Sequence, residues 1–372
     1  MSDAYTELEP AITEFGETTV RPNILQWERD HLSPKSFFKK AAEFGLLKLE
    51  TPRELGGLGL NFSDKVRFAR QLSHYSMAVT FALINSQNIA NRMATSTTPR
   101  HRHDLLPGLL TGELVGCTAL SEPHAGSDFA AIETTATKVS GGWRINGEKA
   151  WITNAVNADV IMLYAQTDME KGWKGIASFL VDARNSGFIR GGKYDLIGGH
   201  ATGVGGFALN DYFAPDDDLI APPGDAFKSA MISINGARTY VAAMCAGMMD
   251  DALQKAASYG KTRTSFGKPL LHHQGLKWSL ADVKSKLEIL DLLTQKAAAK
   301  IDAGEDAILS AAFAKKYAGE ETLSGLEICI QVMGANGIRE DNLLGHHMAC
   351  AKIAAYTDGS TEMMKERIAA YL

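Results

Sequence analysis

The hydrophobic pattern of this chain changes its period twice, and that order constrains the fold more than any other feature. From about residue 8 to 110, apolar residues recur at helical spacing. The segment 112–223 instead holds short β-rich runs between glycine- and proline-containing turns, which is typical of a meander or barrel. From residue 226 onward, long amphipathic segments with short connections predict antiparallel helices. The sequence therefore predicts an α+β protein with an N-terminal helical domain (1–113), a central β-barrel (114–224) and a C-terminal four-helix bundle (225–372).

Two local signals refine this outline. The dipeptides Gly141-Gly142 and Asn146-Gly147 lie between β-rich runs and predict two successive hairpins. The glycine-rich stretch 52–65 predicts a loop, after which Ser63 or Asp64 is a candidate cap for the next helix.

Composition excludes several classes of protein. The 372 residues carry a formal charge of -5, which argues against a general nucleic-acid binder. The four cysteines lie far apart without a CxxC pair, so we expect reduced, buried thiols rather than disulfides or a zinc site. No apolar stretch approaches the ~20 residues that span a membrane, and the acidic start resembles neither a secretory signal nor a transit peptide. These features predict a cytoplasmic protein.

Familiar catalytic and metal-binding patterns are missing from the sequence. The pairs His272/His273 and His346/His347 have no carboxylate or cysteine companions at ligand spacing, so no metal site is predicted. The patterns GxSxG, GxGxxG and GxxxxGK[ST] do not occur, which removes the main support for a nucleophile elbow, a Rossmann site or a P-loop.

Five other segments carry the functional signal: LSEPHAGSD (120–128), KAWITN (149–154), RTSFGKPLLHHQ (263–274), QVMGANG (331–337) and YTDGSTEM (356–363). Each alone has a structural explanation, as a helix cap, a core aromatic residue or a tight turn. Together, in this order and spacing, they resemble the acyl-CoA dehydrogenase family of flavoproteins, and the resemblance covers nearly the whole chain.

The resemblance implies that FAD binds between the barrel and the bundle. Ser121 then bonds the pyrimidine side of the isoalloxazine, Thr153 reaches toward N5 and Trp151 packs over the ring. Donors aimed at this ring system stabilise the reduced flavin. Ser127 is expected near the diphosphate or the thioester arm of the substrate, and the same segment adds Leu120 and Gly126 to the cofactor contacts.

A second group of residues matches contacts to the FAD of a neighbouring subunit. Arg263, Ser265 and Phe266 match the family's RxxFG segment, and a guanidinium suits a pyrophosphate because it offers bidentate donors. Further expected FAD contacts are Gln274, Gln331 and Gly334, with Ser360 and Glu362 beside the catalytic base. Because one site uses two chains, the resemblance implies a homotetramer, a dimer of dimers.

The main departure from the family is Asp358, which stands where a glutamate usually acts as base. The reaction needs a carboxylate to remove the α-proton of the substrate while the β-hydrogen leaves as hydride to the flavin. Aspartate is one methylene shorter, about 1 Å in reach, and such a displacement can cost roughly a hundredfold. Some relatives use aspartate here, including nitroalkane oxidases. The alternative is that Asp358 only caps the last helix and the usual activity is lost.

Two smaller departures accompany it. In the segment NGAR, Arg238 stays but Asn235 replaces the usual acid, so Arg238 is either a substrate contact or an ordinary ion-pair residue. The segment Ala349–Lys352 lacks the family's Arg-Asp pair, which suggests a divergent branch.

The sequence thus predicts FAD-dependent α,β-dehydrogenation of an acyl thioester, linked to CoA or to a carrier protein. Asp358 is the expected base, its backbone N–H polarises the thioester carbonyl, and Gly359 is a further substrate contact. The expected electron acceptor is an electron-transfer flavoprotein or O2. Two alternatives stay open: another flavin reaction on the same fold (a nitroalkane-type oxidase, an enoyl-thioester reductase or a monooxygenase), and a non-catalytic flavoprotein subunit.

Overall fold

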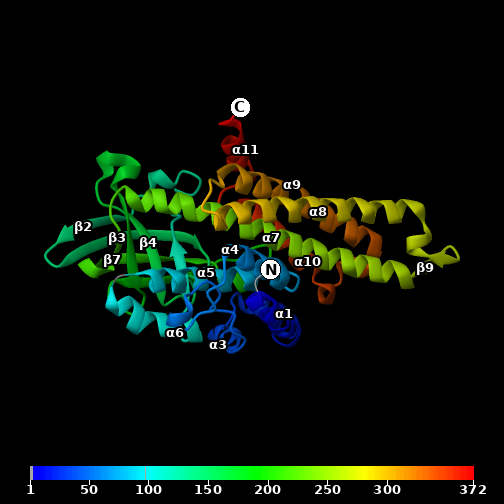
Figure 1. The fold of residues 1–372 in the computed structure, drawn as a ribbon, viewed down its shortest axis with the longest axis horizontal. Coiled ribbons are helices and arrows are strands. Elements are labelled where there is room, and N and C mark those ends of the chain that lie inside the picture. The colour runs from blue at the N-terminus through cyan, green and yellow to red at the C-terminus, as the bar shows by residue number, and fades with distance from the viewer. Residues whose placement is uncertain (1–2, 97) are drawn as a thin grey trace.

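The computed structural model describes residues 3–96 and 98–372, and its elements follow the predicted order of helices, sheet and helices (Figure 1). The N-terminal helices pack around aromatic side chains such as Phe15, Phe37 and Phe38, which are buried because they recur on one face of each helix. These helices are α1 (Asp3–Phe15), α2 (Arg21–Asp30), α3 (Lys35–Glu43), α4 (Phe62–Ser73), α5 (Met77–Thr95) and α6 (Leu106–Thr111).

The central region forms one eight-stranded sheet in the described part of the chain, in the order β6-β7-β3-β2-β4-β5-β8, with β1 parallel to β4. Its strands are β1 (Gly116–Ala119), β2 (Thr135–Val139), β3 (Gly142–Ile152), β4 (Val160–Gln166), β5 (Ile176–Asp182), β6 (Phe188–Lys193), β7 (Gly205–Pro215) and β8 (Leu219–Ala221). The sheet curls around its own core: the Tyr212 hydroxyl on β7 accepts a hydrogen bond from the Asp182 N–H on β5, at 2.9 Å, although these strands are not neighbours in the sheet.

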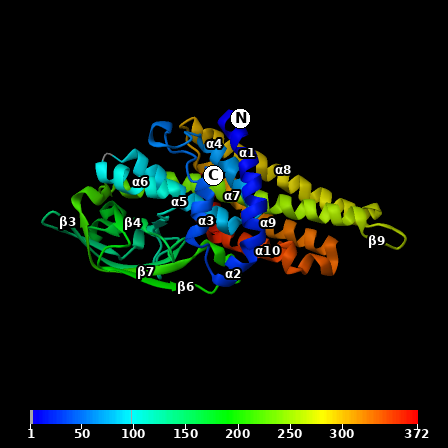
Figure 2. The ribbon, with the colours of Figure 1, turned by 90° about the horizontal axis from the view of Figure 1, so that it is seen from below.

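The C-terminal region is a bundle of long helices that extends away from the sheet (Figures 1 and 2). It contains α7 (Asp225–Thr262), α8 (Gln274–Asp302), α9 (Ile308–Met333), α10 (Leu344–Tyr356) and α11 (Thr361–Ala369). A small hairpin of β9 (Thr264–Ser265) and β10 (Lys268–Pro269) joins α7 to α8 at the far end of the bundle. Its turn residues Phe266 and Gly267 both have positive φ (50° and 77°), as a type I′ turn requires.

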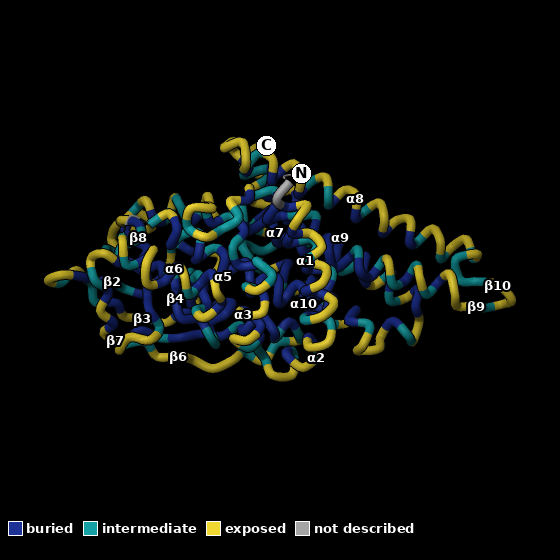
Figure 3. The backbone as a smooth tube through the Cα atoms, turned by 60° about the horizontal axis from the view of Figure 1, so that its bottom comes forward, coloured by how far each residue is buried: buried dark blue, intermediate teal, exposed yellow. Residues whose placement is uncertain are grey.

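Helix α5 joins the three regions. Its first half packs with α7 in the main helical core, whereas Ile89 and Met93 pack with Val160 and Leu180 of the sheet. Helix α5 is therefore buried on nearly every side, and the buried residues include the polar Asn85, Ser86 and Gln87. Buried backbone accordingly concentrates where the regions meet, while the β9–β10 end is largely exposed (Figure 3).

Two sequence predictions are wrong. Asn146-Gly147 is not a hairpin turn: both residues lie inside β3, where the register against β7 shifts between Ile145 and Gly147. The glycine absorbs this bulge at φ 150°, and a Cβ there would come within 2.5 Å of Thr134 Oγ1. The cap of α4 is neither Ser63 nor Asp64 but Asn61, whose side chain accepts from the Asp64 N–H at 2.8 Å.

Other predictions are confirmed. The described chain is helical before and after a sheet region, as the change of period indicates. All four cysteines are free and buried. Among residues 3–96 and 98–372, no helix combines the length and apolarity needed to cross a membrane.

Candidate active site

Asp358 lies in a tight turn between α10 and α11 that two buried cations hold from opposite helices. Asp358 and Gly359 adopt φ of 55° and 101°, a conformation that costs a non-glycine residue about 1–3 kcal/mol unless its surroundings enforce it. Arg238 Nε of α7 donates to the Asp358 carbonyl at 3.1 Å. Lys315 Nζ of α9, whose side chain is fully buried, donates to the Gly359 carbonyl at 3.3 Å. The backbone around Asp358 is thus fixed on both sides.

The carboxyl group of Asp358 is itself left unpaired. Its Oδ2 atom is buried and has no hydrogen-bond partner among the described residues. Burial raises the pKa of Asp358 to about 6, although the charges of Lys315 and Arg238 act in the opposite direction. A half-buried carboxyl group with a pKa near neutrality and one buried oxygen that has no structural partner has the properties of a general base.

The alternative that Asp358 merely caps the last helix is wrong. The cap of α11 is Ser360, whose side chain accepts from the Met363 N–H at 3.3 Å. Arg238 forms no salt bridge with a carboxylate of the described residues, although the charge of Asp358 acts on it and opposes the lowering of its pKa by burial. Its guanidinium instead donates to the Asn235 side chain at 2.9 Å, so Asn235 replaces the family's acid as a neutral acceptor.

The two segments predicted to face the flavin lie side by side near the C-terminal end of β3. The Ala150 N–H donates to the Ser121 carbonyl at 3.1 Å. Beneath them, Lys149 Nζ bonds the Leu120 carbonyl at 3.0 Å and Glu122 Oε1 at 2.7 Å. Glu122 in turn accepts the backbone N–H groups of Glu133 and Thr134. This buried ion pair ties the Ser121 segment to the strand that carries Trp151 and Thr153.

A loop connects this end of β3 to the helix that leads to Asp358. The Asn154 N–H, next to Thr153, donates to the Thr202 carbonyl at 3.0 Å. The same loop packs closely on α10, since a Cβ at Gly199 would lie 2.5 Å from Ile353 Cδ1. The Trp151–Thr153 segment and Asp358 are therefore held by one continuous set of contacts.

These residues fit a flavin ring. Trp151 is 61% exposed, an unusual state for a tryptophan within a strand, and its φ of 62° departs from regular strand geometry. Thr153 is nearly buried beside it, Ser121 is half-buried, and Gly126 and Ser127 lie on an exposed loop. An open aromatic face bordered by hydroxyl groups suits a large planar ring with polar edges.

The other predicted cofactor residues lie at the opposite end of the molecule. Arg263, Ser265 and Phe266 belong to the β9–β10 hairpin, and Phe266 is 95% exposed (Figure 1). Gln274 begins α8, Gly334 follows α9, and Gln331 lines a hollow of about 330 Å³ between these helices. One chain does not bring this group together with Trp151 and Ser121. Ser360 and Glu362 do lie beside Asp358, with Glu362 exposed in the first turn of α11.

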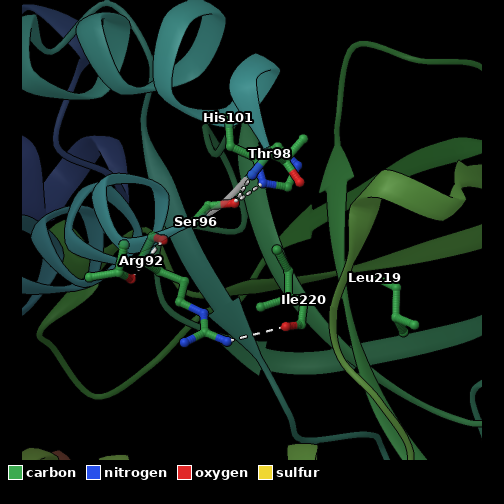
Figure 4. A pocket seen from close by; sticks show the side chains of 7 residues that line it. Arg92, Ser96, Thr98, His101, Leu219 and Ile220 are labelled. Atoms are coloured by element: carbon green, nitrogen blue, oxygen red, sulfur yellow. Dashed lines mark hydrogen bonds between the residues drawn. The ribbon is translucent and has the colours of Figure 1, made fainter.

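A separate hollow of about 220 Å³ lies between the end of α5 and β8 (Figure 4). Arg92 donates across it to the Ile220 carbonyl at 3.3 Å, and Ser96 bonds His101 at 2.7 Å. None of the predicted site residues lines it.

Sequence reasoning missed the buried ions around the site. Lys149 and Glu122 stand inside two of the quoted motifs but were given no role, and Lys315 lies on an alanine-rich face of α9. A lysine in an otherwise apolar helix face is a usable signal, because such a residue is rarely buried without a specific partner.

Comparison with known proteins identifies the family. Models of the acyl-CoA dehydrogenase N-terminal, middle and C-terminal domains match residues 2–113, 117–212 and 224–372. A flavoprotein oxidoreductase is the class that this fold and site define. The chain belongs to the acyl-CoA dehydrogenase family, so it is an FAD-dependent oxidoreductase that acts on CH–CH bonds.

Relatives match over the full length. The mitochondrial short-chain specific acyl-CoA dehydrogenase of Mus musculus is 31% identical over 374 residues, covering 100% of this chain and 90% of the relative. The short-chain specific acyl-CoA dehydrogenase of Megasphaera elsdenii is 31% identical over 370 residues, with coverage of 98% and 96%. The solved butyryl-CoA dehydrogenase from Megasphaera elsdenii superposes with a TM-score of 0.94 at 28% identity, covering 100% of this chain and 98% of that one.

Proposed function

We propose that the protein catalyses α,β-dehydrogenation of an acyl-CoA thioester with Asp358 as the base. The observation that carries this proposal is the buried, unpaired Oδ2 atom of Asp358, in a turn fixed by Arg238 and Lys315. A fixed backbone compensates for the short side chain, since positioning within about 1 Å decides the rate of proton transfer.

Each residue has a defined task in this proposal. Asp358 takes the α-proton, and its own backbone N–H with Gly359 binds the thioester carbonyl, which acidifies the α-carbon. Ser121, Trp151 and Thr153 hold the ring of the cofactor, and the Ser127 loop holds its diphosphate or the thioester arm. FAD bound there would supply the acceptor for the hydride that leaves the substrate β-carbon.

We further propose that a second copy of the chain completes the cofactor site, in a homotetramer built as a dimer of dimers. Support comes from the hairpin: Arg263 and Phe266 are exposed at the end of the bundle farthest from Trp151, where only another subunit can use them for the same FAD (Figure 1). We also propose a cytoplasmic location and an electron-transfer flavoprotein as acceptor, with O2 as the alternative.

The proposed function is tested by anaerobic titration of the purified yellow protein with a series of acyl-CoAs. We expect at least one saturated thioester to bleach the flavin absorbance. Failure of every thioester to do so, with flavin that dithionite still reduces, would overturn the proposal.

The reverse reaction is the second candidate. It is favoured by one relative, the 3-(aryl)acrylate reductase of Clostridium sporogenes, which is 29% identical over 361 residues. In that case an enoyl substrate reoxidises dithionite-reduced flavin, whereas no saturated thioester bleaches the oxidised form.

The pH dependence of flavin reduction follows from the raised pKa of Asp358. The base acts only when it is ionised, so kcat/KM is expected to fall about tenfold per pH unit below about pH 6. An aspartate with an ordinary pKa would begin to lose activity only about two pH units lower. Stopped-flow reduction between pH 5 and 8 measures this limb. A rate that stays constant down to pH 5 contradicts the role of Asp358 or the effect of its burial.

A further inference from the structure

The Glu28 side chain of α2 joins two segments that lie far from it in the chain, the loop 195–203 and helix α10 (Figure 2). Its Oε2 and Oε1 atoms accept the N–H groups of His200 and Ala201 at 3.0 and 2.9 Å. The Oε1 atom also lies 3.7 Å from Nδ1 of His346 on α10. The side chains of Glu28 and His346 are only 13% and 5% exposed, so this ion pair is out of water.

The surroundings keep both members of the pair charged. Burial disfavours the imidazolium of His346, but Cys350 and Glu28 outweigh burial and raise the pKa of His346 above that of an ordinary histidine. Burial also disfavours the Glu28 carboxylate, yet His346 and the two backbone donors lower its pKa. A protonated histidine donates from both ring nitrogens, and His346 has an acceptor for each. Glu28 faces Nδ1, and the Ser76 hydroxyl lies 2.8 Å from Nε2.

Direct catalytic and metal-binding roles do not fit this cluster. Ser76, His346 and Glu28 stand in the order of a hydrolase triad, but Ser76 is 0% exposed and an imidazolium cannot take a further proton. Among residues 3–96 and 98–372, no group of three or more His, Cys, Asp or Glu side chains is placed to hold a metal ion. The pair therefore acts through the loop that it holds.

On one side, this loop supports the strand end that is proposed to face the flavin. The Thr202 carbonyl accepts the Asn154 N–H at 3.0 Å. The side chain of Asn154 is fixed separately, on the carbonyls of Ala82 and Gly116 at 2.8 and 3.0 Å. The loop thus governs the backbone of Asn154. Because Asn154 directly follows Thr153, a shift of the loop would turn the hydroxyl that is proposed to reach flavin N5.

On the other side, the loop is seated against the helix that leads to the base. Gly198 and Gly199 have positive φ, 146° and 72°, and neither has room for a side chain. A Cβ atom would lie 2.7 Å from Ala349 Cβ in the first case and 2.5 Å from Ile353 Cδ1 in the second. Helix α10 ends two residues before Asp358. One loop therefore contacts both the strand end at the flavin and the helix that carries the base.

We propose that Glu28 and His346 are positioning residues of the reaction. By seating the loop 195–203 between α2 and α10, they fix the position of Thr153 relative to Asp358. The hydride and the proton leave adjacent carbons of one substrate, so a misplacement of about 1 Å between the two groups can cost roughly a hundredfold in rate. The inference rests on the proposed function, but flavin binding tests it without turnover.

The test uses the FAD-loaded enzyme and Glu28→Gln, which keeps the shape of the side chain but removes its charge and one acceptor oxygen. We expect flavin reduction at saturating thioester to slow about tenfold or more, with the half-saturating thioester concentration within about threefold of wild type. The flavin absorbance spectrum should shift, and FAD should bind about threefold more weakly or worse. Arg29→Gln, which breaks an exposed ion pair with Glu340 from the next position of α2, is the matched control and should change none of these quantities.

A double variant separates positioning from folding stability. Glu28→Gln alone leaves the buried imidazolium unpaired, whereas Glu28→Gln with His346→Gln removes both charges. The double variant should therefore recover stability against denaturant but neither the reduction rate nor the FAD affinity. Ser33→Ala is a milder change on the same loop, because the Ser33 hydroxyl donates to the Ala201 carbonyl at 2.7 Å. Its loss should alter the same quantities in the same direction by about two- to threefold.

The outcomes separate the inference from the function on which it rests. The inference is wrong if Glu28→Gln folds like the wild type and keeps its flavin spectrum, FAD affinity and reduction rate. It is also wrong if the double variant regains all of these together with stability, because the pair would then be needed only for folding. If no thioester reduces the wild-type flavin, the proposed function fails, and the flavin spectrum and FAD affinity of the variants decide the inference by themselves.

Discussion

Replacing Asp358 with asparagine is expected to abolish flavin reduction by acyl thioesters while making the folded protein more stable. The variant keeps the shape of the side chain but cannot take a proton, so the rate of reduction should fall by about 10²–10⁴. Stopped-flow absorbance under anaerobic conditions measures this loss. Equal rates in the variant and the wild type would exclude Asp358 as the base.

We expect stability to rise while activity falls, because the Oδ2 atom of the Asp358 carboxyl group is buried without a hydrogen-bond partner. Its folded pKa of about 6 lies above that of an ordinary aspartate, so ionisation costs the folded state free energy at neutral pH. At pH 8 we expect Asp358→Asn to raise the free energy of unfolding by about 1–2 kcal/mol. The gain should shrink as the pH falls through 6 and vanish near pH 4. Glu366→Gln, an exposed carboxyl group on α11, is the matched control and should change neither quantity.

This pairing of lost activity with gained stability distinguishes a base from a structural residue. A capping aspartate would show the reverse, since loss of a cap destabilises a helix by about 1 kcal/mol. Asp358→Glu adds a further test: it keeps a base but lengthens it, so it should retain more activity than the asparagine variant.

The architecture could be predicted because it depends on signals that are local. The period of the apolar residues and the density of turns identified helices, sheet and helices without any knowledge of contacts. Local signals fail where a tertiary contact competes. Asn146-Gly147 has the composition of a hairpin turn, yet pairing with β7 keeps the strand continuous and turns the glycine into a bulge.

The candidate site was predictable only in part for the same reason. Asp358, Trp151 and Arg263 stand in segments whose order resembles a known family. The residues around them have no such signature: Lys315 and Arg238 meet at the Asp358 turn from helices far apart in the chain.

Replacing Lys149 with methionine is expected to cause the largest loss of stability and to release FAD. Lys149 and Glu122 are 0% and 2% exposed, and removal of one partner of a buried pair typically costs about 3–5 kcal/mol. Glu122 would keep its two backbone donors but lose its counter-ion. The Leu120 carbonyl would also lose its donor, which loosens the segment that carries Ser121. Denaturant unfolding and FAD fluorescence measure the two effects.

A double variant shows how much of this loss belongs to the unpaired charge. Glu122→Gln in the Lys149→Met background removes the buried negative charge. The double variant should therefore lose about 1–3 kcal/mol less stability than the sum of the two single variants. FAD affinity should not recover to the same degree, because the Leu120 carbonyl still has no donor. Lys138→Met, which breaks an exposed ion pair with Asp216 on the same sheet, is the control and should stay within about 1 kcal/mol of wild type. If Lys149→Met proves as harmless as Lys138→Met, the buried pair does not hold the flavin-facing segments together.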